Sequence, residues 1–179
     1  MSTNPQSDQA GRVVWHQGSW QLEAESVTLP DGTVVERAYV NHPGAVVLVP
    51  LLGNTVLMLA QYRLPFKRTM LELPAGTRLS DESWLACAQR ELREETGYRA
   101  ARFTPLGEIL PILSYSNEVL AIYLAEELTP DPLPMDADEQ IEIRPMPLSQ
   151  LTNMALTGDL QDAKSIVAIL RAARHLNAF

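Results

Sequence analysis

Apolar and polar residues alternate over short runs through most of the chain, and turn-forming residues separate these runs. Alternation with a period of two is typical of strands, so each run predicts one. The expected strands are residues 20–29, 33–40, 46–52, 55–62, about 102–110, 118–125 and 141–146. The Pro-Asp-Gly turn at 30–32 and the Gly-Asn turn at 53–54 join the first four strands into two hairpins.

Three segments carry apolar residues at helical spacing instead. The first lies between residues 80 and 97, where Ser80 or Asp81 is expected to cap the first turn and Gly97 to end the helix. Its apolar stripe consists of Leu85, Ala88 and Leu92, with Trp84 on one side.

The other two helical segments lie near the end of the chain. Residues 148 to about 156 predict a helix that Gly158 stops, and Asp162 is expected to cap the last helix. The order of strands, one helix, strands and two helices predicts an α+β fold. Along the chain we expect a mobile N-terminal segment (1–11), an N-terminal antiparallel β-hairpin region (12–43) and a main domain (44–179).

Composition narrows the class of protein. The 179 residues carry a formal net charge of −8 and no basic run, which argues against a general nucleic-acid binder or a membrane-surface protein. The most apolar stretch, 44–60, is interrupted by turn residues, so no transmembrane helix is expected. The polar N-terminus lacks an apolar signal core, which favours a cytoplasmic location. The single cysteine, Cys87, excludes an internal disulfide and is interpreted as a packing residue.

The first helical segment carries the most informative charges. Glu91 and Glu95 are four residues apart, so they are neighbours along the flank of the apolar stripe, with Glu94 close beside them. Carboxylates that lie together against apolar packing repel one another unless a cation compensates. Oxygen ligands suit Mg²⁺ or Mn²⁺, and Mg²⁺ commonly binds substrate phosphates as well. The alternative is an ordinary helix with exposed ion pairs.

The spacing of the charged and glycine residues resembles the Nudix box of the Nudix hydrolases. The matching residues are Gly76, Glu82, Arg90, Glu91, Leu92, Glu94, Glu95 and Gly97. Tyr98 departs from the motif, because the family usually has an aliphatic residue there. So many fixed positions are rarely met by chance.

The resemblance implies a site as well as a fold, in which helices sandwich a mixed β-sheet. Glu91 and Glu95 would be the principal metal ligands, with Glu94 assisting and the backbone carbonyl of Ala75 completing the set. Arg90 would orient a glutamate. Glu82, near the positive end of the helix dipole, is interpreted as structural.

Softer motifs at 35–37, 61–63, 72–76 and 158–164 resemble the ADP-ribose pyrophosphatase and nucleoside-diphosphate-sugar hydrolase branch. That branch implies a homodimer in which the N-terminal hairpin region helps each subunit to complete the other's site. Arg37 and Arg63 would bind phosphate or the terminal sugar, since an arginine fork suits phosphate oxygens. Trp20 or Trp15 would lie near the base. The alternatives are exposed strand arginines and packed core rings.

One departure from the branch concerns residues 113–118. ADP-ribose pyrophosphatases commonly have proline and glycine shortly before Ser-Asp-Glu, whereas this chain reads Leu-Ser-Tyr-Ser-Asn-Glu. A relaxed preference, or another sugar nucleotide, therefore fits as well as ADP-ribose. Glu118 is expected to help position metal or water, or else to be solvated.

The resemblance implies attack of water on phosphorus, which yields a nucleoside monophosphate and a sugar phosphate. The general base would be a glutamate on the acidic, proline-containing loop 130–139, and we choose Glu139. Its competitors are Asp136, Asp138 and Glu142. Two other functions stay open: sanitation of modified nucleoside triphosphates, and a non-catalytic nucleotide-sensing module.

Overall fold

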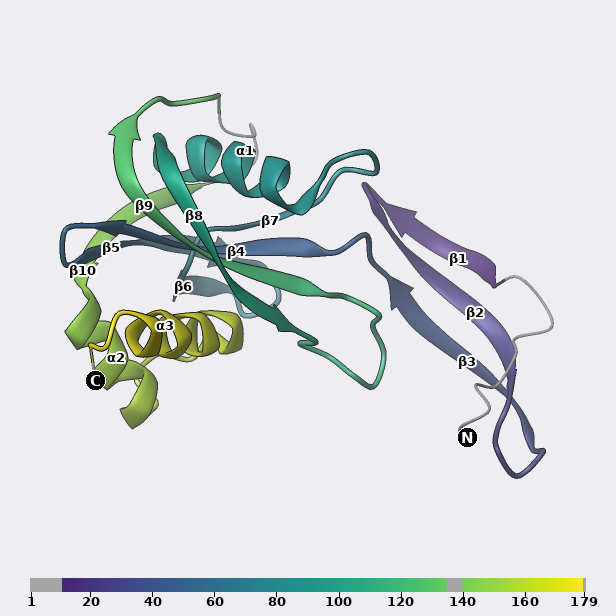
Figure 1. Cartoon of the computed structure of the whole chain (residues 1–179). Helices are drawn as coiled ribbons and strands as arrows, with labels where there is room; N and C mark the ends of the chain where they lie inside the picture. The colour runs from purple at the N-terminus through teal and green to yellow at the C-terminus, as the bar shows by residue number, and fades with distance from the viewer. Residues whose placement is uncertain (1–10, 135–139, 179) are drawn as a thin grey trace.

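A computed structural model describes residues 11–134 and 140–178. The chain begins with an antiparallel sheet, the N-terminal sheet, formed by β1 (Arg12–Gln17), β2 (Trp20–Thr28) and β3 (Val34–Asn41) in that order. Figure 1 shows this sheet standing beside the rest of the molecule and joined to it through the end of β3. The predicted hairpin of 20–40 is therefore present, and β1 extends it by one strand that the alternation pattern missed.

The second sheet forms the centre of the molecule. Its strands are β4 (Ala45–Leu52), β5 (Thr55–Arg63), β6 (Arg68–Glu72), β7 (Ala75–Thr77), β8 (Tyr98–Ile109), β9 (Leu120–Pro130) and β10 (Ile141–Pro147). The order is β10-β5-β4-β9-β8, with β6 on β5 and β7 on β4. β4 and β9 run parallel and the other pairs antiparallel, so the sheet is mixed.

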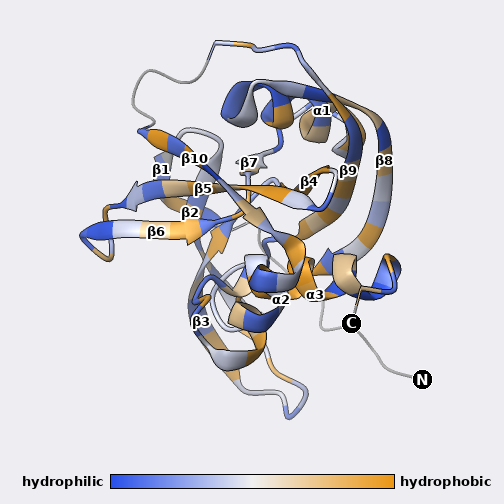
Figure 2. Ribbon diagram, turned by 90° about the vertical axis from the view of Figure 1, so that its left-hand side faces the viewer, coloured by the Kyte–Doolittle hydropathy of each residue, from blue (hydrophilic) through white to orange (hydrophobic). Residues whose placement is uncertain are grey.

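Helices cover both faces of this sheet. α1 (Trp84–Thr96) packs on one face, and α2 (Leu148–Thr157) and α3 (Ala163–His175) pack on the other. Side chains of β4 alternate between the two layers: Val46 and Leu48 pack towards α1, whereas Val47 and Val49 pack towards α2 and α3. A strand buried on both faces reads as a continuous apolar run, as 45–52 does. Figure 2 shows the apolar stretches of β4 and β5 between these helices.

The α+β expectation is confirmed, and so are the two C-terminal helices. Gly158 ends α2 in the left-handed conformation, and the Asp162 side chain caps α3 by accepting from the Ser165 amide. Strands β6 and β7 were not predicted, because they are too short to show alternation. No helix among the described residues is both long and apolar enough to cross a membrane.

Two predicted details of α1 are wrong. The cap is Ser83 and not Ser80 or Asp81, since the helix begins at Trp84 and the Ser83 Oγ accepts from the Ala86 amide. Leu85 is exposed, since Trp84 is the residue of the first turn that packs against the sheet. Gly97 ends the helix as predicted, with a φ of 74°.

Candidate active site

The glutamates of α1 lie where this helix crosses β7. Glu91 and Glu95 are buried, at 8% and 3% exposure, on the side of the helix that packs against the sheet. The Ala75 amide donates to Glu95 Oε2 at 2.8 Å, which fixes one carboxylate against the strand. Glu94 is less buried and completes a group that we call the glutamate cluster (Glu91, Glu94 and Glu95). The spacing in the sequence thus predicted a real convergence of carboxylates.

Gly76 makes this close packing possible. A Cβ added at Gly76 would lie 1.8 Å from Cδ of Glu91 and about as close to both of its carboxylate oxygens. Only a glycine therefore lets the Glu91 carboxylate lie against the backbone of β7. The glycine position of the box serves the glutamate directly, a role that spacing alone did not predict.

Arg90 is the cation among these carboxylates. Its Nη1 donates to Glu91 Oε1 at 2.6 Å and to Glu94 Oε2 at 2.9 Å. Its Nε and Nη2 donate to the two carboxylate oxygens of Glu82, at 2.9 and 2.8 Å. The hydrogen bond with Glu82 is the main reason that the pKa of Arg90 is raised, and the same bond lowers the pKa of Glu82. Arg90 thus orients two members of the cluster, and Glu82, two residues before α1, anchors Arg90.

The oxygen donors fit a hard divalent cation, although they do not form a ready-made cage. No group of three acidic, histidine or cysteine side chains among residues 11–134 and 140–178 is arranged as metal ligands. Arg90 lies between Glu91 and Glu94, so a metal ion there requires those two carboxylates to turn partly away from the guanidinium. Carboxylates with no histidine or cysteine ligand nearby suit Mg²⁺ or Mn²⁺ rather than Zn²⁺.

A cavity of about 450 Å³ adjoins the cluster, and we call it the Arg63 cavity. Its walls come from β5, β7, the loop between β8 and β9, and the start of α3. Arg63 donates to both oxygens of buried Glu72 at 2.7 Å, a bond that raises the pKa of Arg63. Lys164 Nζ donates to Glu72 at 2.6 Å and to Asp162 at 2.9 Å. Two cations therefore line this cavity next to Gly76.

Lys164 and Glu72 were not predicted as site residues. Lys164 directly follows the capped start of α3, which carries it across to the end of β6. The available signal was the Asp-Ala-Lys segment at 162–164, but only tertiary structure shows which carboxylate this lysine meets. Arg63 is held in a bidentate pair with Glu72 while 40% of its side chain is exposed, so its role as a phosphate ligand stays a prediction.

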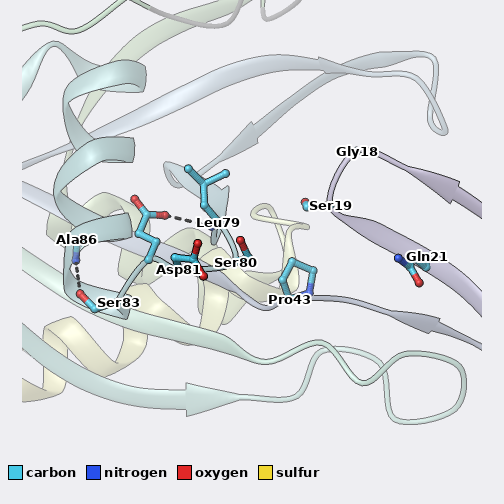
Figure 3. A pocket seen from close by; sticks show the side chains of 10 residues that line it. Gly18, Ser19, Gln21, Pro43, Leu79, Ser80, Asp81, Ser83 and Ala86 are labelled. Carbon is cyan, nitrogen blue, oxygen red and sulfur yellow. Dashed lines mark hydrogen bonds between the residues drawn. The ribbon is translucent and has the colours of Figure 1, made fainter. Parts of the chain in front are cut away.

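A larger hollow, about 1090 Å³, lies elsewhere (Figure 3). It opens between the β1–β2 turn at Gly18 and Ser19 and the loop 79–83 before α1. Among the described residues, no arginine or lysine lines it, and Glu82 links it to the network of Arg90. The smaller Arg63 cavity is therefore the better place for an anion, because two cations line it, whereas the charged side chains in the described lining of the larger hollow are all acidic.

Other predicted site residues lie on the N-terminal sheet, away from the glutamate cluster of the same chain (Figure 1). Arg37 is on β3 and donates to the Glu36 carbonyl at 3.1 Å. Trp20, on β2, stacks at a tilt on Trp15, with ring centroids 5.2 Å apart. Trp15 is 49% exposed, so it is not a packed core ring. One chain alone does not bring Arg37 or Trp20 to its cavity.

The remaining acidic residues divide into two groups. Glu118 lines the Arg63 cavity, with Oε1 at 3.7 Å from His42 Nδ1, and it precedes β9 instead of opening the strand. Glu142 is exposed on β10 and pairs with Arg144 at 2.9 Å. Glu139, Asp136 and Asp138 lie outside the described residues, as do residues 1–10 of the expected N-terminal segment.

Comparison with known proteins identifies the class. The NUDIX domain model matches residues 41–168, so this chain belongs to the Nudix family. Members of this family use divalent metal ions, which agrees with the glutamate cluster.

Individual relatives cover most of the chain. It is 34% identical to the ADP-ribose pyrophosphatase of Bacillus subtilis (strain 168), over 83% of this chain and 82% of that protein. It is 31% identical to the ADP-ribose pyrophosphatase of Mycobacterium tuberculosis, over 87% and 77%. A crystal structure of an ADP compounds hydrolase matches the fold with a TM-score of 0.83, covering 99% of this chain and 98% of that one at 22% identity.

Proposed function

We propose that this protein hydrolyses the pyrophosphate bond of ADP-ribose or a related nucleoside diphosphate sugar, with Mg²⁺ or Mn²⁺, to a nucleoside monophosphate and a sugar phosphate. The observation that carries the proposal is the buried pair Glu91 and Glu95 of α1, which packs against β7 beside a cavity lined by Arg63 and Lys164. A diphosphate needs both parts, because the cluster supplies metal ligands and the cavity supplies cations.

In this proposal the glutamate cluster and the Ala75 carbonyl hold the metal. When bound, the metal neutralises the diphosphate and stabilises the charge that develops at phosphorus. The protein has a net charge of −8, so its anionic substrate depends on this local reversal of potential. Arg90 holds Glu91 and Glu94 at the cluster, and its Nη2 donates to the carbonyl of Thr77, a residue that lines the cavity, at 3.1 Å; its role is to orient ligands.

Arg63 and Lys164 bind phosphate oxygens from the cavity wall. Arg63 is already oriented by Glu72, so less side-chain entropy is lost when a phosphate binds. Glu118 faces the same cavity and helps to position metal or water. Glu139 is the proposed general base, with Glu142 as an alternative among the described residues.

Arg37 and Trp20 enter this scheme through a second copy of the chain. We propose a homodimer in the cytoplasm, in which the N-terminal sheet of one subunit brings Arg37 to phosphate and Trp20, or Trp15, to the base in the partner's site. Exposed apolar residues on this sheet, namely Val13, Val14, Trp15 and Val34, support the proposal that the sheet is an interface.

A substrate panel tests the function. ADP-ribose, other sugar nucleotides, dinucleoside polyphosphates and nucleoside triphosphates are assayed with Mg²⁺ and with Mn²⁺, and the products are identified. We expect a monophosphate from sugar nucleotides and none from triphosphates. Turnover of triphosphates alone would favour nucleotide sanitation instead.

The variant Glu95→Gln separates an enzyme from a sensing module. The amide oxygen still accepts from Ala75, so the fold is kept while one charged ligand is lost. We expect kcat to fall about 100-fold or more, as for removal of one strong electrostatic contact at a reacting centre. If the wild type shows no turnover and Glu95→Gln binds the ligand as tightly as the wild type does, the protein is a sensor.

A further inference from the structure

The loop between β8 and β9, residues 110–119, forms one wall of the Arg63 cavity through Pro111, Ile112 and Glu118. Apolar packing does not hold this loop in place, because Leu113 is 81% exposed and Tyr115 is 56% exposed. A loop without a buried apolar anchor keeps one conformation only if polar contacts fix it. Figure 1 shows the loop reaching from the central sheet towards the end of β3.

Most of the hydrogen bonds that fix the loop lead to β3 and the residue after it, and one more joins its last residue, Val119, to the Ala45 amide of β4 at 3.0 Å. Along the backbone, the Val40 amide donates to the Tyr115 carbonyl at 2.8 Å, and the Asn117 amide donates to the Val40 carbonyl at 3.2 Å. The Asn117 side chain adds two more bonds. Its Nδ2 donates to Asn41 Oδ1 at 2.7 Å, and its Oδ1 accepts from the His42 amide at 2.8 Å.

Asn41, the partner of the Asn117 side chain, is itself held in place by residues of the N-terminal sheet. Asn41 Nδ2 donates to Glu23 Oε1 at 2.6 Å, and the Tyr39 hydroxyl donates to Glu23 Oε2 at 3.1 Å. Glu23 lies on β2, so two strands determine how Asn41 presents its oxygen to Asn117. The loop is therefore fastened to a prepared position on the sheet.

The fastened residue is next to a residue of the cavity wall. Glu118 directly follows Asn117, and its own amide donates to Ser116 Oγ at 3.1 Å. A displacement of Asn117 must therefore move Glu118, and with it the wall that a bound nucleotide sugar would contact.

We propose that Asn117 is a positioning residue that sets substrate selectivity, because it pins this cavity wall to the N-terminal sheet. The inference rests on the proposed function and adds a second role for the N-terminal sheet, within its own chain. A fixed wall rejects ligands that do not match it, whereas a loose wall adapts to several. The ligand class is a nucleoside diphosphate sugar, and the wall selects among such compounds.

The test uses the full-length variant Asn117→Ala, which removes both side-chain bonds and leaves the backbone contacts. For the best substrate of the panel, we expect KM to rise about tenfold, which corresponds to 1.4 kcal/mol, with a smaller fall in kcat because Glu118 moves as well. The ratio of kcat/KM between the best and second-best sugar nucleotides should fall several-fold. Asn153→Ala, an exposed asparagine of α2, is the matched control and should change neither quantity.

A double-variant cycle shows whether Asn117 acts through Asn41. Asn41→Ala should also raise KM, and the double variant should raise it by less than the product of the two single effects. Independent multiplication of the effects would overturn the pairing. An equal fall in kcat for all substrates, or a lower Tm with unchanged selectivity, would show a merely structural residue.

Amide hydrogen exchange supplies a readout that needs no turnover. In Asn117→Ala, the amides of Val40 and Asn117 should exchange at least about tenfold faster than in the wild type, because the loop opens more often. Unchanged exchange would overturn the docking role. If the wild-type protein cleaves nothing on the panel, the proposed function fails, and the exchange result still decides whether Asn117 pins the loop.

Discussion

The Arg63 cavity and the N-terminal sheet each carry an arginine that we propose as a phosphate ligand, but only one of the two is held in place. Arg63 is fixed by a bidentate pair with buried Glu72, on the wall of a cavity beside the glutamate cluster. Arg37 is exposed on β3 and donates to the carbonyl of its neighbour Glu36. The side chains of the cavity are held in place by other residues of the same chain, whereas Arg37 on the N-terminal sheet is exposed.

This difference divides the proposed binding roles between the cavity and the N-terminal sheet. Groups that must meet a metal and a diphosphate at fixed distances lie on packed elements, where neighbours limit their rotamers. Groups that act at a distance from the reacting centre can lie on a sheet that also serves as an interface. If the contacts are a guide, the activity of the cavity depends on how its walls are packed. The contribution of the N-terminal sheet depends on a partner subunit.

The largest effect is expected for Gly76→Ala, which disturbs the packing of the cluster itself. The added Cβ would overlap the Glu91 carboxylate, so this ligand must leave its position. We expect kcat/KM to fall about 100-fold and the free energy of unfolding to fall by about 1–3 kcal/mol. Steady-state kinetics and urea denaturation measure the two effects.

A second substitution separates these two effects. In Gly76→Ala/Glu91→Ala the clashing atoms are gone, so much of the stability should return while activity stays low. If the single variant Gly76→Ala keeps full activity, the position of Glu91 seen here is not the active one.

The next effect concerns the bidentate pair at the other side of the cavity. Arg63→Lys keeps the charge but cannot donate to both oxygens of Glu72 with one planar group, so we expect kcat/KM to fall about tenfold. Arg63→Ala should cost about 100-fold, because the charge is lost as well. Arg102→Ala removes an exposed arginine of β8 and its ion pairs with Glu126 and Glu127, and it serves as the control, with no effect on activity. Equal activity of the lysine and wild-type forms would show that the fork geometry is unimportant.

The sequence predicted those parts of the fold and site that depend on local spacing. Strands β2, β4 and β5, all three helices and the burial of Glu91 and Glu95 follow from periodicity within a few turns of chain. Short strands such as β7 have too few residues for a pattern, although β7 carries Ala75 and Gly76. The misplaced cap of α1 arose because several residues before the helix are suitable caps, and only the structure shows that Ser83 is used.

Contacts between residues far apart in the chain could not be predicted from the sequence. Lys164 meets Glu72 across 92 positions of the chain, and Asn117 meets Asn41 across 76. No local pattern encodes such pairs, because they depend on how α3 and the β8–β9 loop return to earlier strands. The same limit applies to Arg37, whose proposed target is not in its own chain at all.

Complementation between subunits tests that proposal. Arg37→Ala alone should raise KM about tenfold, as loss of one phosphate contact does. Mixed with Glu95→Gln subunits, it should give about one quarter of wild-type kcat/KM, measured well below KM, because half the dimers are mixed and each mixed dimer has one intact site. Unfolding and refolding the two variants together, followed by kinetics, measures the recovery.

The matched control replaces Arg37→Ala with Arg63→Ala in the same mixture. Arg63 and Glu95 belong to the same cavity, so no mixed dimer has an intact site and no activity should return. Absence of recovery in the Arg37→Ala mixture as well would place Arg37 outside the partner's site. The N-terminal sheet would then act only through the loop that it holds.

Thiol reagents are expected to have the smallest effect, with no loss of activity. They compare the buried side of α1 with the exposed N-terminal sheet. Burial on α1 raises the pKa of Cys87 to about 12, so below that pH the thiol stays protonated and is a poor nucleophile. We expect the native protein to react at pH 9 at least about 100-fold more slowly than the urea-unfolded chain. A cysteine introduced by Asp31→Cys, in the exposed turn between β2 and β3, should react at once in the native protein. Rapid labelling of native Cys87 would mean that α1 opens locally, and the glutamate cluster could not then be a rigid metal site.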